Sequence, residues 1–132
     1  GKFFPVCVLG NDPFGSTLDA TVAGEFLDGK PMVAHRILSA RDASGCRILF
    51  ISASEKARMG EVLRSVRVMP MLTVSDAPRF LEKGGMIQLT LIQGRVRFEV
   101  NLGAAESAGL KLSSELLKVA ASVTGKNPTS AR

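Results

Sequence analysis

The segment GNDPFGST, residues 10–17, has the glycine spacing of a phosphate-binding loop. Such a loop wraps phosphates with successive backbone N–H groups, and it needs a lysine directly after its second glycine. Ser16 stands at that position, Asp12 puts a negative charge where the phosphate would lie, and Pro13 has no backbone N–H. We therefore interpret the segment as a strand-to-helix turn, in which Ser16 or Thr17 caps the helix that follows.

Hydrolytic chemistry requires a nucleophile, a base and an orienting group. His35 is the only histidine, and it lies in the middle of an expected strand. Ser75 and Asp76 end another strand, but the Ala77-Pro78 that follows is a helix start signal, so we interpret the pair as a helix cap. One histidine and two distant cysteines do not supply a metal site. The sequence therefore predicts no catalytic residues, metal or cofactor, and it argues against an enzyme.

Cys7 and Cys46 are the only cysteines, and both occupy strand-like positions. In a reducing compartment they would be small buried hydrophobic residues, whereas in an oxidising compartment they could form a disulfide. The residues by themselves leave these two alternatives open.

Length and composition predict one globular domain without a membrane span. The chain has 132 residues, of which 45% are hydrophobic, and no apolar run reaches the ~18 residues of a transmembrane helix. The net charge of +5 comes from scattered lysines and arginines with acids between them, and there is no Trp or Tyr. A nucleic-acid-binding surface would cluster the basic residues and interleave stacking aromatics. We therefore expect no nucleic-acid partner and no direct membrane insertion.

Strand and helix periodicities alternate through the first two thirds of the chain. Strands are predicted at 3–9, 32–38, 47–52 and 71–76, and helices at 16–26 and 55–66, the second capped by Ser54. Runs such as ILFI lack polar alternation, which favours strands that are covered on both faces. Alternating strands and helices predict a mostly parallel sheet in an α/β sandwich.

The pattern changes after a short helix expected at 77–83. Gly84 and Gly85 predict a structural turn that caps this helix, with positive φ at one of the two glycines. Residues 86–101 predict a β-hairpin that turns at Gln93-Gly94, and 113–123 predict a final helix. The fold class expected is therefore a single-domain, three-layer α/β sandwich with a mixed, largely parallel sheet flanked by helices, ending in a β-hairpin plus helix. We assign this domain to 1–124 and a tail to 125–132.

Several sequence blocks resemble the YfiR-like family. They are CVLGNDPF (7–14), CRILFIS (46–52), LTVSD (72–76), FLEKGGMI (80–87), RVRFEVN (95–101), AGLKLSS (108–114) and LL (116–117), in the family's order. The resemblance implies a small bacterial periplasmic protein with an α/β sandwich and no known catalysis, exported and with its signal peptide already removed. It also implies that the family's disulfide lies between Cys7 and Cys46.

The best-understood members of that family bind the periplasmic sensor domain of an inner-membrane diguanylate cyclase and hold the cyclase inactive. The resemblance thus predicts a non-catalytic repressor that lowers cyclic-di-GMP signalling, and it allows a homodimer. The alternative is a periplasmic small-ligand sensor working with a sensor kinase or an outer-membrane receptor, with its pocket near 10–14, 52–54 and 75–78 at the carboxyl ends of the strands. The candidate partner contacts are Phe3, Phe4, Met69, Met71 and Ile92.

Overall fold

The computed structural model describes residues 1–93, 95–111 and 122–124. Its strands are β1 (Phe4–Leu9), β2 (Phe26–Leu27), β3 (Lys30–Ile37), β4 (Ile48–Ile51), β5 (Leu72–Ser75), β6 (Ile87–Ile92), β7 (Arg95–Asn101) and β8 (Ser122–Thr124). Its α-helices are α1 (Ser16–Val22), α2 (Met59–Val66) and α3 (Leu102–Ser107). Its 3₁₀ helices are η1 (Ala40–Ala43), η2 (Ala53–Arg58) and η3 (Leu81–Lys83).

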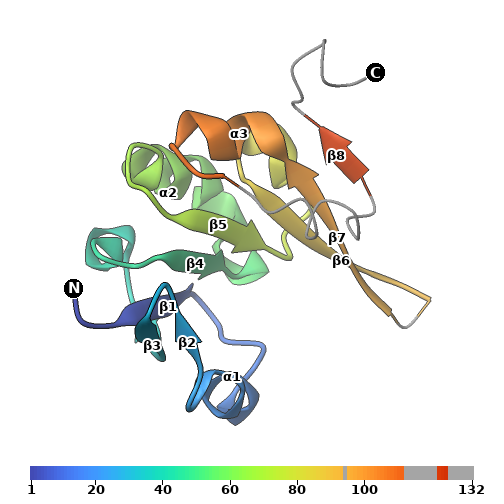
Figure 1. Ribbon diagram of the computed structural model, residues 1–132. Coiled ribbons are helices and arrows are strands. Elements are labelled where there is room, and N and C mark those ends of the chain that lie inside the picture. The colour runs from blue at the N-terminus through green and yellow to red at the C-terminus, as the bar shows by residue number, and fades with distance from the viewer. Residues whose placement is uncertain (94, 112–121, 125–132) are drawn as a thin grey trace.

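Within the described residues these strands form one sheet in the order β2-β3-β1-β4-β5-β6-β7-β8 (Figure 1). The central pairs, from β3 through β1, β4 and β5 to β6, are all parallel. The pairs β2–β3 and β6–β7 are antiparallel, whereas β8 runs parallel to β7. This arrangement confirms the predicted α/β class, with a mixed, largely parallel sheet flanked by helices and followed by a hairpin and a helix.

Side chains of β1 alternate between two apolar layers. Phe4 and Val6 pack with Val22 of α1 on one face of the sheet. Cys7 and Leu9 point to the other face and join the main core, whose members include Met59, Val62, Leu63 and Val66 of α2. Helices therefore cover both faces of the sheet around β1 and β4, as the uninterrupted apolar runs of these strands predict.

Helix α1 is shorter than predicted. It ends at Val22 rather than at residue 26, and Gly24 follows with a φ of +77°. Phe26 then pairs with Pro31 across a two-residue turn at Asp28 and Gly29, both of which have positive φ. That is the geometry of the tight hairpin turn that an Asp-Gly pair favours, so β2 replaces the last turn of the predicted helix.

The predicted helix caps also shift. Gly15 takes the cap position of α1 without a side-chain hydrogen bond, so neither Ser16 nor Thr17 caps it. Ser52 rather than Ser54 caps the next helical segment, because its hydroxyl accepts the Ser54 N–H, and that segment begins as the 3₁₀ helix η2.

The segment expected as a helix at 77–83 consists of turns followed by η3. Gly84 ends η3 with a φ of +104°, and its N–H donates to the Leu81 carbonyl, which is the geometry expected of one of the paired glycines.

The carboxyl-terminal part differs from the sequence prediction. Helix α3 follows β7 directly, where no helix was predicted, and the Asn101 side chain caps it by accepting the Ala104 N–H at 3.1 Å. Most of the helix predicted at 113–123 and the predicted tail at 125–132 lie outside the described residues. Ser122 and Val123, however, belong to the strand β8, which pairs with β7.

Candidate functional site

The phosphate-loop-like segment is held as a turn by one arginine from β3. Arg36 donates from Nε to Asp12 Oδ2, from Nη1 to Asp19 Oδ1 and from Nη2 to the Gly15 carbonyl, each at 2.8 Å. Asp12 Oδ1 also accepts the Phe14 N–H at 2.7 Å. Carboxylates and a carbonyl therefore face the guanidinium where a phosphate-binding loop would present donors, and the turn interpretation is confirmed.

These contacts favour the ionised form of both carboxyl groups. The Phe14 backbone N–H, followed by the Arg36 guanidinium, lowers the pKa of Asp12 below its ordinary value. The hydrogen bond from Arg36 likewise lowers the pKa of Asp19, and the two carboxylates raise the pKa of Arg36. The cluster therefore has a structural role at the start of α1.

The loops at the carboxyl ends of the central strands bind one another. The Asn11 N–H donates to Ser54 Oγ at 2.9 Å, and the Ala53 N–H donates to Asp76 Oδ1 at 3.0 Å. A Cβ added to Gly10 would lie only 2.7 Å from Ser54 Oγ. The three segments named for a ligand pocket thus meet as predicted, but their polar groups are used to join the loops.

The helix cap predicted at Ser75 and Asp76 is wrong, because turns follow them and η3 begins only at Leu81, with Phe80 at its cap position. Ser75 instead starts a turn. Its hydroxyl accepts the Ala77 N–H at 2.9 Å and donates to the Ile51 carbonyl at 2.5 Å. The residue is fully buried, so this hydroxyl connects β5 to β4 as well as starting the following turn.

Cys7 and Cys46 are joined by a disulfide, with 6.0 Å between their Cα atoms. Both cysteines are buried in the main core. The bond connects β1 to the segment that enters β4, which is its parallel neighbour in the sheet. The pairing implied by the family resemblance is therefore present.

His35 lies on an exposed part of β3 near the disulfide. It shares the lining of a cavity of about 270 Å³ with Asp42 and Ser44. In the described part of the chain, no hydrogen bond joins His35 to either residue, so this cavity lacks the base–orienter contact of a catalytic site.

The five residues predicted as partner contacts differ in how exposed their side chains are. Phe4 and Met71 are only 4% and 1% exposed, so their assignment as partner contacts is wrong. The Phe4 ring packs against α1 and lies beneath the Arg47 guanidinium, and Met71 belongs to the main core. Met69 is partly buried against that core, and the side chain of Ile92 lies outside the described residues.

Phe3 remains exposed, and so does Phe26. Phe3 directly precedes Phe4, which β1 pairs with Met32 of β3. The residue before Met32, Pro31, pairs with Phe26 of β2 on the other side of β3. Phe3 and Phe26 are 53% and 64% exposed, and we call these two residues the aromatic patch. Sequence reasoning missed Phe26 because it assigned residue 26 to a helix; the Asp28-Gly29 turn was the available signal.

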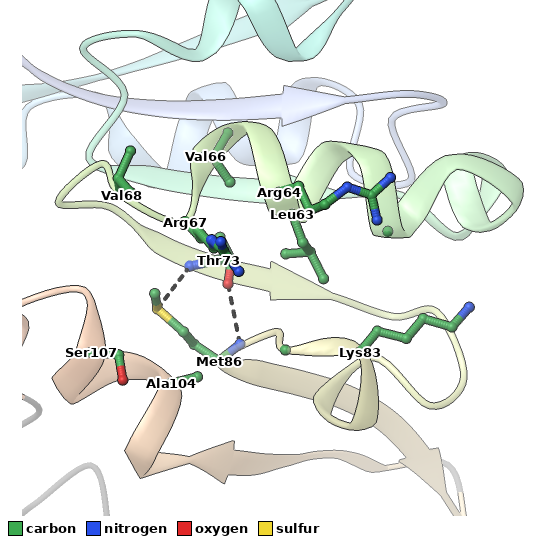
Figure 2. Close-up of a pocket in the computed structure, with 12 residues that line it drawn as sticks. Leu63, Arg64, Val66, Arg67, Val68, Thr73, Lys83, Met86, Ala104 and Ser107 are labelled. Atoms are coloured by element: carbon green, nitrogen blue, oxygen red, sulfur yellow. Dashed lines mark hydrogen bonds between the residues drawn. The ribbon is translucent and has the colours of Figure 1, made fainter.

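A cavity of about 530 Å³ is bounded by α2, β5, η3 and α3 (Figure 2). Its apolar lining includes Leu63 and Val66 from α2, Met86 from just before β6 and Ala104 from α3. Thr73 and Met86 hold its base together: the Thr73 N–H donates to Met86 Sδ at 3.5 Å, and the Met86 N–H donates to Thr73 Oγ1 at 3.1 Å.

Three basic residues line the same cavity. Arg64 and Arg67 come from α2 and from the residue after it, and Lys83 comes from η3 (Figure 2). All three are exposed, and none forms an ion pair with another residue that the structure describes. No acidic residue is among the described lining residues. The cavity therefore combines an apolar interior with a positive rim.

This cavity lies at the opposite end of the sheet from the pocket predicted for a ligand sensor. Met86 precedes β6 and Thr73 is near the start of β5, so the cavity is at the amino ends of these parallel strands. Four segments, distant in sequence, contribute to it. A spacing signal existed only for Arg64 and Arg67, which lie three residues apart, the first in the predicted helix at 55–66 and the second directly after it.

The described residues contain no group of three or more His, Cys, Asp or Glu side chains able to hold a metal ion. No described helix combines the length and the apolar character needed to cross a membrane.

Comparisons with known proteins agree with the fold. The solved structure of a conserved domain protein from Vibrio cholerae O1 biovar El Tor matches with a TM-score of 0.66 and 14% identity. The match covers 91% of this chain and 54% of the Vibrio chain, so this chain spans about half the length of that protein. At this identity the likeness shows the fold alone, and no curated protein sequence matches the chain. The model of the YfiR/HmsC-like family matches residues 1–121, and the chain therefore belongs to this family.

Proposed function

We propose that this protein is a non-catalytic periplasmic regulator that binds the periplasmic sensor domain of an inner-membrane diguanylate cyclase and holds the cyclase inactive. Membership of the YfiR/HmsC-like family is the observation that carries this proposal, because the best-understood YfiR-like proteins act in that way. The consequence of binding would be less cyclic-di-GMP in the cell.

The disulfide supports the proposed compartment. Cys7 and Cys46 are bonded inside the main core, and such bonds persist in oxidising compartments such as the bacterial periplasm. A reducing cytosol would oppose the formation of this bond.

The aromatic patch is the proposed contact surface. Phe3 and Phe26 are large apolar side chains that the described part of the protein leaves mostly uncovered. Aromatic residues are enriched at the centres of protein interfaces, where their burial supplies much of the affinity. Among the predicted contacts whose side chains the structure describes, Phe3 is the one that is clearly exposed.

A regulator of this kind acts through differential affinity. It binds the inactive conformation of the cyclase more tightly than the active one, and this difference limits how far it shifts the equilibrium. A difference of roughly 3 kcal/mol would change the ratio of inactive to active cyclase about 150-fold.

The test is deletion of the gene in its native host, with cyclic-di-GMP measured before and after. We expect the level to rise and to fall again when the wild-type gene is restored. The double variant Phe3→Ser and Phe26→Ser should be exported at normal levels but should restore repression poorly. Leu38→Ser is the matched control, because Leu38 is also apolar and exposed but lies outside the aromatic patch.

An unchanged level after deletion would contradict the proposal. Capture of a sensor kinase or an outer-membrane receptor from solubilised membranes would then favour the ligand-sensor alternative. Full repression by the double variant would instead contradict only the proposed contact surface.

A further inference from the structure

The cavity between α2 and α3 has the size and the lining of a small-molecule site. At about 530 Å³ it falls within the range of ligand pockets, which are mostly apolar with a few convergent polar groups. Leu63, Val66 and Met86 are buried side chains of its apolar lining. These residues also belong to the packed core, so the wall that they form is largely preformed.

Positive charge gathers at this cavity without a counter-charge in the described residues. Arg64, Arg67 and Lys83 line it together, and none is paired there with a carboxylate. Four other arginines of the described chain are paired with carboxylates, among them Arg36 with Asp12 and Arg79 with Glu82. Neighbouring like charges repel, and a bound anion relieves that repulsion.

A hydroxyl group at the floor of the cavity adds a hydrogen-bond donor. Thr73 Oγ1 accepts the Met86 N–H, which leaves the hydroxyl hydrogen of Thr73 available to donate. Arginine pairs well with both carboxylate and phosphate oxygens, because its N–H groups form a planar fork. The cavity thus offers cations at its rim and apolar contact within.

From this combination we infer that the cavity binds a small amphiphilic anion: an apolar chain or ring with one carboxylate or phosphate monoester group. The apolar part contacts Leu63, Val66, Met86 and Ala104, and the anionic group lies among Arg64, Arg67 and Lys83 (Figure 2). This inference does not depend on the proposed repression of a cyclase, since it concerns the isolated protein and a different surface.

Binding is measured by titration calorimetry of the purified protein with decanoate, decyl phosphate, decanol and inorganic phosphate, each below its aggregation concentration. We expect one amphiphile bound per chain, and binding of decanol at least about ten-fold weaker than that of the better anion. The comparison of decanoate with decyl phosphate identifies the preferred head group. Added salt should weaken the binding of the anions, because the cations at the rim are exposed.

Variants locate the site. Arg64→Gln, Arg67→Gln and Lys83→Gln should each weaken binding by up to about five-fold, which is the upper range for an exposed ion pair. Ala104→Leu should reduce binding by filling the apolar interior. Lys56→Gln is the matched control, because Lys56 is exposed and basic but does not line the cavity.

Three results would overturn the inference. The first is the absence of saturable binding of either anion at millimolar concentration. The second is equal binding of decanol and the anions. The third is an equal loss of affinity in Lys56→Gln and Lys83→Gln. Amide chemical shifts of the wild-type protein provide an independent check, and changes confined to residues away from α2, η3 and α3 would also contradict the assignment.

Discussion

The Phe80 ring lies so close to Gly85 that a Cβ on this glycine would fall 2.2 Å from the ring atom Cε2. Phe80 is fully buried in the main core, so the ring cannot move aside without disturbing its neighbours. Gly84, the preceding residue, has open space around its Cα but a φ of +104°. The two adjacent glycines are therefore needed for different reasons.

Gly85→Ala should destabilise the protein by roughly 1–3 kcal/mol, the usual cost of inserting a carbon into a packed core. Gly84→Ala should cost about 1 kcal/mol through backbone strain alone. Gly84→Asn should cost less than Gly84→Ala, because asparagine tolerates the left-handed region better. Urea unfolding of the three variants measures these differences. Equal stability of Gly85→Ala and the wild type would contradict this prediction, because it would show that the core around Phe80 can rearrange to accommodate the added methyl group.

Removing the disulfide should lower the free energy of unfolding substantially. The bond closes a separation of 39 residues. Chain-entropy arithmetic for such a loop gives roughly 4 kcal/mol, a value that depends on the model used. Guanidinium unfolding with and without reductant measures the effect. The double variant Cys7→Ala and Cys46→Ala is the control, and its stability should not respond to reductant. A wild-type protein equally stable in both conditions would contradict this prediction.

Arg36 should make stability depend on pH in the acid range. The Phe14 N–H, followed by Arg36, lowers the pKa of Asp12 below its ordinary value of 3.8, and Arg36 lowers the pKa of Asp19 below the same value. Because the folded-state pKa values are lowered, the stabilisation is fully present above the unfolded value and is lost as the pH falls through the folded values. Arg36→Gln should therefore be less stable than the wild type at neutral pH, and the difference should shrink below that ordinary value.

Chemical denaturation from neutral pH to about pH 2 measures this difference. Arg79→Gln serves as the control, because Arg79 forms an exposed pair with Glu82 three residues away, which contributes little to stability. A difference between wild type and Arg36→Gln that stayed constant through the acid range would rule out the proposed linkage.

Ser75→Ala should destabilise the protein by about 1–3 kcal/mol, because both the Ile51 carbonyl and the Ala77 N–H lose a hydrogen-bond partner in a buried position. Ser75→Thr retains the hydroxyl but adds a methyl group to a fully buried site. Ser54→Ala, at an exposed loop hydroxyl, is the comparison and should cost less. Thermal unfolding ranks the three variants by stability. A Ser75→Ala protein as stable as Ser54→Ala would mean that these hydrogen bonds contribute little.

Local patterns of residues were enough to predict the central sheet. The apolar runs at β1 and β4 mark strands covered on both faces, since burial on both sides removes polar alternation. The turn at Gly84 was also predictable, because positive φ is a requirement of the local backbone. In both cases the physical cause acts within a few residues of the chain.

Contacts between segments distant in sequence determined the features that were not predicted, namely the strand β2 and the burial of individual apolar side chains. Phe26 has the spacing of an α1 residue, but pairing with Pro31 places it in β2. Phe4 and Met71 resemble candidate contacts in sequence, yet packing against α1 and the main core buries them, whereas Phe3 stays exposed.

The α/β class, the parallel central strands and the turn at Gly84 follow from local sequence patterns, and the family resemblance identified the cysteine pair. The exposure of individual apolar side chains, and the presence of Arg64, Arg67 and Lys83 around one cavity, follow from the packing of the elements. The physical reason is that secondary structure follows from periodicity along the chain. Exposure and charge clustering depend instead on which elements pack together, and that is set by the whole fold.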